Sequence, residues 1–169
     1  MPLFLLKLTQ GKFGYLLGFA LCFAIVALAL MIQTTYQLEP CPLCISQRIV
    51  FMSLGVLFLI AAFVPANTLF KNLLMVLQVL TAFGGAGVAI RHWYLQANKE
   101  SMIADCGVGF DYMFENFPLE KAFKLLFRGT GDCAAIDWTL LGLTLPQLAL
   151  ISFMAFAMYA IWLWKRSTT

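Results

Sequence analysis

Residues 13–32 read FGYLLGFALCFAIVALALMI, a run of 20 residues without one charged side chain. A helix of about 20 apolar residues crosses the ~30 Å hydrocarbon core of a bilayer. The chain of 169 residues is 62% hydrophobic and 11% charged, whereas an ordinary soluble domain has about 25% charged residues. Run length and composition therefore predict a membrane protein whose surface faces the lipid bilayer. The net charge of +3 is too small and too dispersed to favour a nucleic-acid partner.

Three further apolar runs follow along the chain. The run 49–64 has only 16 residues, so it reaches a spanning length only if its helix begins near Cys44. This places Cys44 and Arg48 in the first turns of a membrane helix. The fold predicted is one all-α domain, residues 1–169, a bundle of four transmembrane helices. Its helices are expected at about 13–32, 44–64, 71–90 and 146–164, with loops at about 33–43 and 91–145.

The distribution of Lys and Arg predicts the orientation of the helices. Basic residues flank the cytoplasmic ends of membrane helices, and the short loop 33–43 has none. The basic residues of the other short flanks place both termini and Lys71 in the cytoplasm and the two loops on the far side. The first run exceeds the ~7–15 residues of a signal-peptide core, so we expect it to remain as a helix. These flanking basic residues are Lys7, Lys12, Lys71, Lys165 and Arg166.

Two features inside the spans are expected to serve packing. Cys22 lies in the middle of the first span, where a free cysteine behaves as a small hydrophobic residue. The stretch AFGGAGVA at 82–89 puts small residues four apart, as in the pairs Ala82 with Ala86 and Gly85 with Ala89. Such a face lets a neighbouring helix approach closely.

The other four cysteines all fall on the non-cytoplasmic side, where disulfides form. Cys41 and Cys44 are separated by Pro-Leu, whereas Cys106 and Cys133 are 27 residues apart. A zinc site would need a second Cys-x-x-Cys arm, so we expect no metal. Two inert disulfides are an alternative, but a Cys-x-x-Cys bridge closes too small a loop to stabilise a fold much. The pattern favours two exchanging disulfides, Cys41–Cys44 and Cys106–Cys133.

The position of Cys44 suits redox exchange. The positive end of a helix dipole stabilises the thiolate, which is the reactive form of cysteine. Arg48 lies four residues further on, so its cation can approach the same sulfur. Arg48 could instead extend to the lipid head groups, as arginines near helix ends do.

A reduced Cys41–Cys44 pair must pass its two electrons to an acceptor. The sequence has no nucleotide-binding fingerprint and no cysteine cluster for iron–sulfur. Its single histidine, His92, excludes a haem held by two histidines of one chain. A lipid-soluble quinone therefore remains as the expected acceptor. Arg48 and His92 are the candidates to bind its oxygens, although His92 could also be a solvated residue at the membrane interface, next to Arg91 and Trp93.

Several motifs resemble the DsbB family, the bacterial inner-membrane quinone reductases that reoxidise the periplasmic thiol oxidase DsbA. The resemblance covers nearly the whole chain and rests on CPLCISQR at 41–48, RHWYLQ at 91–96, the Cys106 loop and GDCAAIDWTLLGLTLPQ at 131–147. It implies that a DsbA-like oxidase attacks the Cys106–Cys133 disulfide, with Cys106 as its partner in the mixed disulfide. Exchange with Cys41–Cys44 then carries the electrons to ubiquinone, or to menaquinone without oxygen.

Two alternatives and one structural expectation remain from the sequence. The chain could be a dedicated paralogue that serves one specialised oxidase, or a membrane scaffold with two structural disulfides and no enzymatic activity. Residues 114–128, FENFPLEKAFKLLFR, separate apolar from charged side chains at helical spacing. This pattern predicts a short helix lying on the membrane surface between Cys106 and Cys133.

Overall fold

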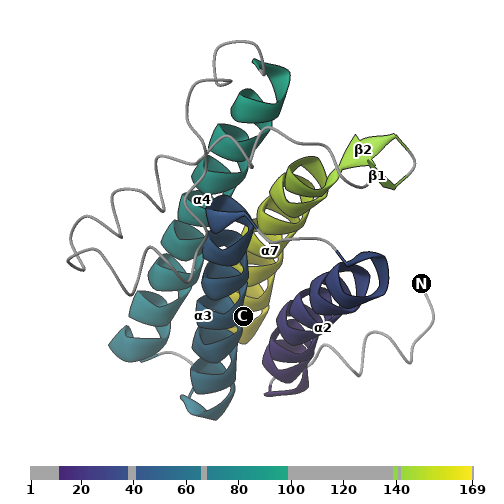
Figure 1. Ribbon diagram of the computed structural model, residues 1–169. Coiled ribbons are helices and arrows are strands. Elements are labelled where there is room, and N and C mark those ends of the chain that lie inside the picture. Colours follow the sequence, from purple (N-terminus) through teal and green to yellow (C-terminus); the bar gives the residue numbers. More distant parts are fainter. Residues whose placement is uncertain (1–11, 38–40, 66–67, 99–138, 141, 169) are drawn as a thin grey trace, which may run out of the picture.

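The computed structural model describes residues 12–37, 41–65, 68–98, 139–140 and 142–168. Four helices are long and apolar enough to cross a membrane, which confirms the four predicted spans. The described elements, shown in Figure 1, are α2 (Lys12–Tyr36), α3 (Pro42–Phe63), α4 (Leu69–Ala97), β1 (Thr139–Leu140), β2 (Leu143–Thr144) and α7 (Leu145–Thr168).

The helices extend beyond the apolar runs that predicted them. Helix α2 continues to Tyr36 and α4 to Ala97, beyond the ends of the spans predicted at about residues 32 and 90, and parts of both predicted loops are helical. A helix ends where its backbone bonds are capped, which need not be where the first polar residue occurs. In α4 the end is at Asn98, whose backbone N–H donates to the Tyr94 carbonyl at 3.1 Å.

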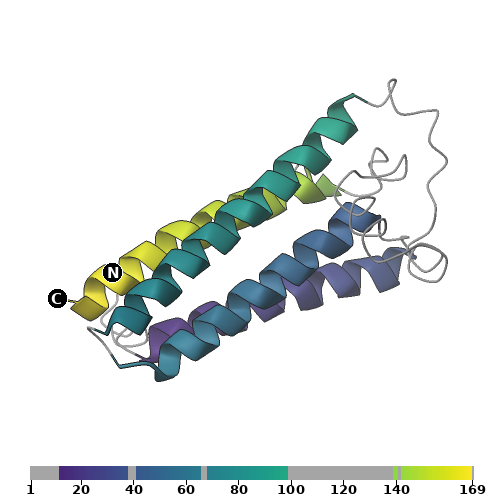
Figure 2. The same cartoon turned by 90° about the vertical axis from the view of Figure 1, so that its left-hand side faces the viewer.

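Neighbouring helices in the bundle run in opposite directions. Helix α2 packs on α3, α3 on α4, and α4 on α7, whereas α2 and α7 touch only sparsely (Figures 1 and 2). The end of α2, the start of α3, the end of α4 and the start of α7 therefore lie at one end of the bundle, which we call the cysteine end. The weak α2–α7 contact leaves one seam of the bundle loosely closed.

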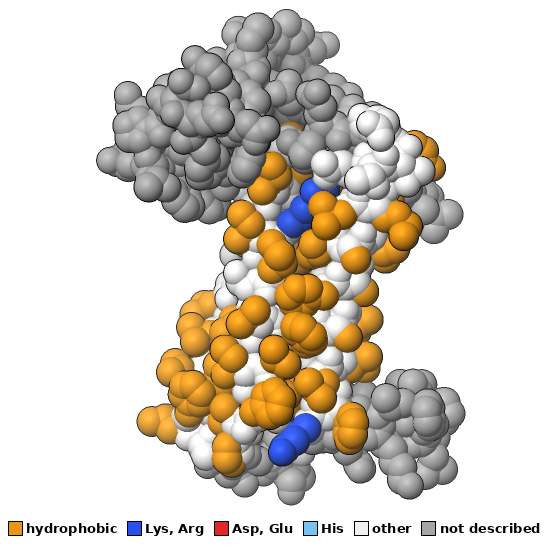
Figure 3. Space-filling model, turned by 60° about the horizontal axis from the view of Figure 1, so that its bottom comes forward, with side chains coloured by type: hydrophobic (Ala, Val, Ile, Leu, Met, Phe, Trp, Pro, Cys, Tyr) orange, Lys and Arg blue, Asp and Glu red, His pale blue; other side chains and the backbone are white. Residues whose placement is uncertain are grey.

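The outer surface of the helices is apolar. Large hydrophobic side chains such as Leu28, Val56, Leu80 and Met158 are exposed on the four helices. In the view of Figure 3, orange side chains cover the middle of the molecule, while blue Lys and Arg side chains appear only towards its two ends. This distribution is the one that a lipid-facing surface requires, because a bilayer core solvates apolar side chains but not charges.

The small residues of α4 are packed in the bundle core, as the sequence predicted, and at Gly85 the closely approaching helix is α7. Ala82, Gly85, Ala86 and Ala89 are buried. A Cβ at Gly85 would overlap the ring of Phe153, which stacks on Phe51 of α3 at a centroid distance of 4.0 Å. Cys22, fully buried in the same core, also has the packing position expected of it.

We expect Gly85→Ala to destabilise the bundle. The added methyl group has to displace the Phe153 ring, and overpacking of this kind costs about 1–3 kcal/mol. Gly87→Ala is the matched control, because a Cβ there meets no atom within 4 Å. Thermal unfolding in detergent measures both; equal stability of the two variants would contradict the close approach of α4 and α7.

Lys71 joins three helices at the end opposite the cysteines. Its ammonium donates to the carbonyl oxygens of Ala61 and, at 3.4 Å, Val64, in the last turn of α3. It also lies 3.8 Å from the centroid of the Tyr15 ring on α2. The side chain is buried, yet its charge neutralises the negative end of the α3 dipole. Together with Lys12, it makes this end of the bundle cationic.

A small hairpin leads into α7 at the cysteine end. These residues fall in the loop predicted at about 91–145, and within it β1 and β2 pair antiparallel, with Thr139 opposite Thr144. Gly142 takes φ +80°, a value that glycine adopts without strain, and so permits the tight turn. The Gln147 side chain then accepts a hydrogen bond from the Thr144 N–H at 2.9 Å, as in a helix capping box. These contacts fix where α7 begins.

Candidate functional site

The Cys-x-x-Cys pair forms the beginning of α3. Cys41 is the residue before the first turn, Pro42 is the first residue of the helix, and the Cys41 carbonyl accepts from the Ile45 N–H at 3.2 Å. Proline suits this position because the first N–H groups of a helix have no helical carbonyl to bond. Cys44 therefore lies in the opening turn, as the length of the second span predicted, at the positive end of the helix dipole.

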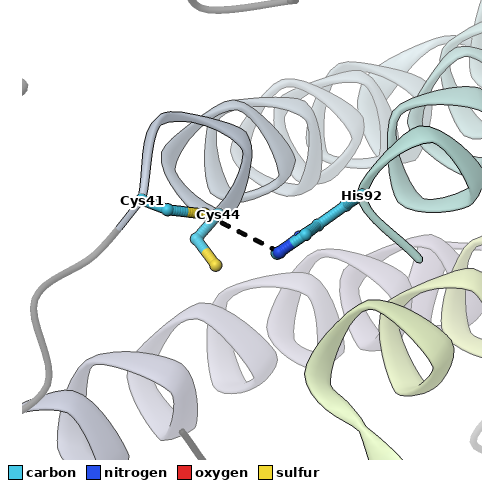
Figure 4. Close-up of side chains that lie close together, drawn as sticks. All are labelled: Cys41, Cys44 and His92. Carbon is cyan, nitrogen blue, oxygen red and sulfur yellow. Dashed lines mark hydrogen bonds between the residues drawn. The ribbon is translucent and has the colours of Figure 1, made fainter. Parts of the chain in front are cut away.

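His92 reaches the pair from α4. Its Nε2 atom lies 3.7 Å from the Cys41 sulfur, and its Nδ1 atom lies 3.2 Å from the side-chain nitrogen of Gln47. Figure 4 shows the imidazole directed from α4 towards the two cysteines at the start of α3. His92 is only 2% exposed, so the alternative of a solvated interfacial residue is wrong. It also lies inside α4 and does not end it, since the helix continues to Ala97.

Apolar packing holds these polar groups together. Leu43 of α3 and Leu95 of α4 are both buried and form a small cluster with Cys41, against which Val88 packs. The cluster fixes the start of α3 against the last turns of α4. The Cys41–His92 contact joins residues 51 apart in sequence and depends on this packing.

A cavity of about 240 Å³ lies on the other side of the pair, between α2, α3 and α7. Cys44, Gln47 and Arg48 form its polar wall. Leu28 lines the cavity and is also exposed on the outside of the bundle, so the cavity lies next to the lipid-facing surface. Its remaining lining is Ile25, Val26, Ala29, Ile32, Phe51, Leu145, Leu148, Ala149 and Ser152.

Arg48, which lines this cavity, links α3 to α2. Its Nη1 atom donates to the side-chain oxygen of Gln33 on α2 at 2.5 Å. The sequence predicted that Cys44 and Arg48 share one helical face, and both do line the same cavity. His92 is not among the residues lining the cavity, so its quinone contact stays a prediction.

Two glutamines of the site were not predicted from the sequence. Gln47 contacts His92 and lines the cavity, while Gln33 binds Arg48. The available signal was their polarity at the edges of apolar runs, since polar groups in membrane helices are costly and often functional. Cys106, Cys133 and the surface helix predicted at 114–128 lie outside the described residues.

Comparison with known proteins identifies the family. Residues 11–163 match the model of the family described as disulfide bond formation protein DsbB. The chain belongs to the DsbB family. It is 53% identical to disulfide bond formation protein B of Methylobacillus flagellatus, over 92% of this chain and 93% of the relative.

Other relatives agree over similar lengths. Disulfide bond formation protein B of Azoarcus sp. is 42% identical over 88% of this chain and 89% of the relative. The protein of that name from Methylococcus capsulatus is 40% identical over 94% and 97%. Membership of the DsbB family, together with four helices able to span a membrane, implies a membrane protein with disulfide oxidoreductase activity.

Proposed function

We propose that this protein is a thiol:quinone oxidoreductase of the bacterial inner membrane. In this proposal it reoxidises a DsbA-like periplasmic dithiol oxidase at Cys106–Cys133 and passes the electrons through Cys41–Cys44 to ubiquinone or menaquinone. The observation that carries the proposal is the cavity in which Cys44 and Arg48 form one polar wall beside the lipid-facing surface. It joins a thiol, a cation and an apolar space at one end of the bundle.

The residues around the cavity fit a quinone head group. A cavity of about 150 Å³ is enough to hold benzene, and this one measures about 240 Å³ with a mostly apolar lining. When bound there, a quinone would accept the two electrons and two protons that the dithiol loses on becoming a disulfide. The Arg48 guanidinium would hydrogen-bond a quinone oxygen, and Cys44 would present its sulfur to the same space.

His92 and Gln47 have a different part in this proposal. The imidazole Nε2 is a hydrogen-bond partner of the Cys41 sulfur, and Gln47 holds the opposite ring nitrogen. Because the ring is buried and held on both sides, it keeps Cys41 in a defined position while Cys44 faces the cavity. Both sulfurs thus lie near the imidazole, but of the two cysteines Cys44 alone lines the cavity.

The test of the function is a reconstituted assay. Purified protein in detergent receives a reduced DsbA-type oxidase and, in separate assays, a soluble ubiquinone or menaquinone analogue, and quinone absorbance is followed. We expect steady turnover with one quinone reduced for each dithiol oxidised. Oxidation of the dithiol protein without quinone loss, or no turnover with either quinone class, would contradict the proposal.

His92→Ala separates positioning of Cys41 from binding of quinone. Loss of one hydrogen bond to the sulfur should lower kcat about tenfold, the equivalent of 1.4 kcal/mol. If the ring acts only on Cys41, KM for quinone stays within about twofold of the parent value, because a KM change reports binding. A KM that rises while kcat is unchanged would instead assign His92 to the quinone.

The proposal also fixes an orientation, with both termini in the cytoplasm and the cysteine end facing the periplasm. It is supported by Lys12, Lys71, Lys165 and Arg166, all at the end opposite the cysteines. Fusions to the C-terminus test it. Green fluorescent protein should fluoresce there, and alkaline phosphatase, which needs the oxidising side, should be inactive; the reverse result would overturn the orientation.

A further inference from the structure

Three metal-binding atoms converge at the cysteine end. The sulfurs of Cys41 and Cys44 and a ring nitrogen of His92 all lie within 4.8 Å of one another, and we call these residues the thiol–imidazole cluster. Cys41 and His92 are buried, and the two cysteines are not joined by a disulfide in this structure. The cluster therefore describes the dithiol form of the pair.

The spacing of the cluster matches the spacing of ligands around one tetrahedral ion. With Zn–S of about 2.3 Å and Zn–N of about 2.0–2.1 Å, a sulfur and a nitrogen on the same zinc lie roughly 3.6 Å apart. The observed distance between the Cys41 sulfur and His92 Nε2 is 3.7 Å. Two sulfurs on one zinc lie roughly 3.8 Å apart. The sulfurs of Cys41 and Cys44 lie within 4.8 Å of each other, so a small rotation of one cysteine side chain brings them to this distance.

The surroundings of His92 are those of a metal-binding histidine. Such residues bond their second ring nitrogen to a neighbouring group, which fixes the ring and directs the first nitrogen to the ion. Here Gln47 occupies the Nδ1 side at 3.2 Å while Nε2 faces Cys41. The Gln47 atom at this distance is the amide nitrogen, which donates to Nδ1. Metal binding through Nε2 requires the proton on Nδ1 instead, and Gln47 accepts a hydrogen bond from it when its amide rotates to present its oxygen.

The cysteine spacing alone predicted no metal, because it did not place His92 beside the pair. We propose that the dithiol form of this protein binds one thiophilic divalent cation, of the class of Zn²⁺ and Cd²⁺, through Cys41, Cys44 and His92. The two thiols lose their protons on binding, and the two thiolates neutralise the charge of the ion. Within the described residues, Cys41, Cys44 and His92 are the Cys, His, Asp or Glu side chains whose ligand atoms converge, so the proposed site is defined by these three ligands. No electrons move in this step.

Metal binding and disulfide formation exclude each other. Both sulfurs are ligands in the metal form and are bonded to each other in the oxidised form, so the site exists only in the reduced pair. A bound ion therefore holds the pair reduced and blocks its oxidation. The inference rests on the geometry of the cluster alone and stands whether or not the electrons of the pair go to a quinone.

The experiment uses the full chain in detergent with Cys106→Ser and Cys133→Ser, so that Cys41 and Cys44 are the remaining pair able to form a disulfide. The protein is reduced, freed of reductant and titrated with Cd²⁺, whose bonds to thiolate absorb in the near ultraviolet. We expect saturation at one equivalent in the reduced protein and no band in the oxidised protein. Cys22→Ala is the matched control and should bind like the parent, because Cys22 is buried elsewhere in the core.

Variants of His92 decide whether the cluster acts as a unit. Loss of even an outer partner of a metal site weakens binding about 10–100-fold, so His92→Ala should weaken Cd²⁺ binding by at least that factor. His92→Cys should restore tight binding with a more intense band, which also shows that the fold tolerates change at this position. Binding that is unchanged in His92→Ala, or absent from the reduced parent at micromolar Cd²⁺, would overturn the proposal.

Discussion

In the Cys44→Ser variant we expect quinone reduction to fall by more than about a thousandfold, the scale seen when a nucleophile is removed from a catalytic unit. A serine hydroxyl neither forms a disulfide with Cys41 nor gives up electrons. Cys44 is also the only cysteine lining the cavity among the described residues. The measurement is the rate of quinone absorbance loss with a reduced DsbA-type oxidase as donor.

Cys22→Ala is the matched control for this loss. Cys22 is fully buried in a hydrophobic cluster separate from the one that contains Cys41, and it does not line the cavity, so its removal should leave turnover within about twofold of the parent. The alternative of a membrane scaffold with structural disulfides predicts no difference between the two variants. Full activity in Cys44→Ser would therefore end the proposed mechanism.

Apolar runs were sufficient to predict the helices of this fold but not their ends. The absence of charge over residues 13–32 predicted α2, yet the helix continues through Gln33 to Tyr36. Hydropathy reports which residues tolerate lipid, whereas a helix ends where capping groups satisfy its last carbonyls. The difference matters for function, because the extra turn of α2 carries Gln33, the partner of Arg48.

The site was predictable only where its residues are close in sequence. The four-residue spacing of Cys44 and Arg48 placed both on one face of a helix, and both line the cavity. The Cys41–His92 contact could not be predicted this way, because it depends on the packing of Leu43 against Leu95 across two helices. His92, which was predicted from its position alone to contact the quinone, lies 3.7 Å from the sulfur of Cys41 in the structure.

In Arg48→Ala we expect KM for quinone to rise about 10- to 150-fold, since a hydrogen bond from a charged group contributes about 1.5–3 kcal/mol. Arg48→Lys should recover only part of this, because an ammonium lacks the planar fork of a guanidinium. Gln33→Leu should raise KM less, since it removes the partner that orients Arg48 but keeps the cation. Steady-state kinetics with varied quinone measures all three variants.

Arg91→Ala is the control that separates quinone binding from a general effect of charge at the cysteine end. Arg91 lies on α4 at the same end of the bundle, is exposed and does not line the cavity. If Arg48 merely reached lipid head groups, both alanine variants would behave alike.

Alkylation of reduced Cys44 by iodoacetamide tests whether Arg48 acts on the thiolate. If Arg48 only stabilises the Cys44 thiolate, Arg48→Ala should slow this alkylation while KM stays unchanged. A raised KM with unchanged alkylation assigns Arg48 to the quinone, and a change in both shows that one guanidinium serves the sulfur and its acceptor together.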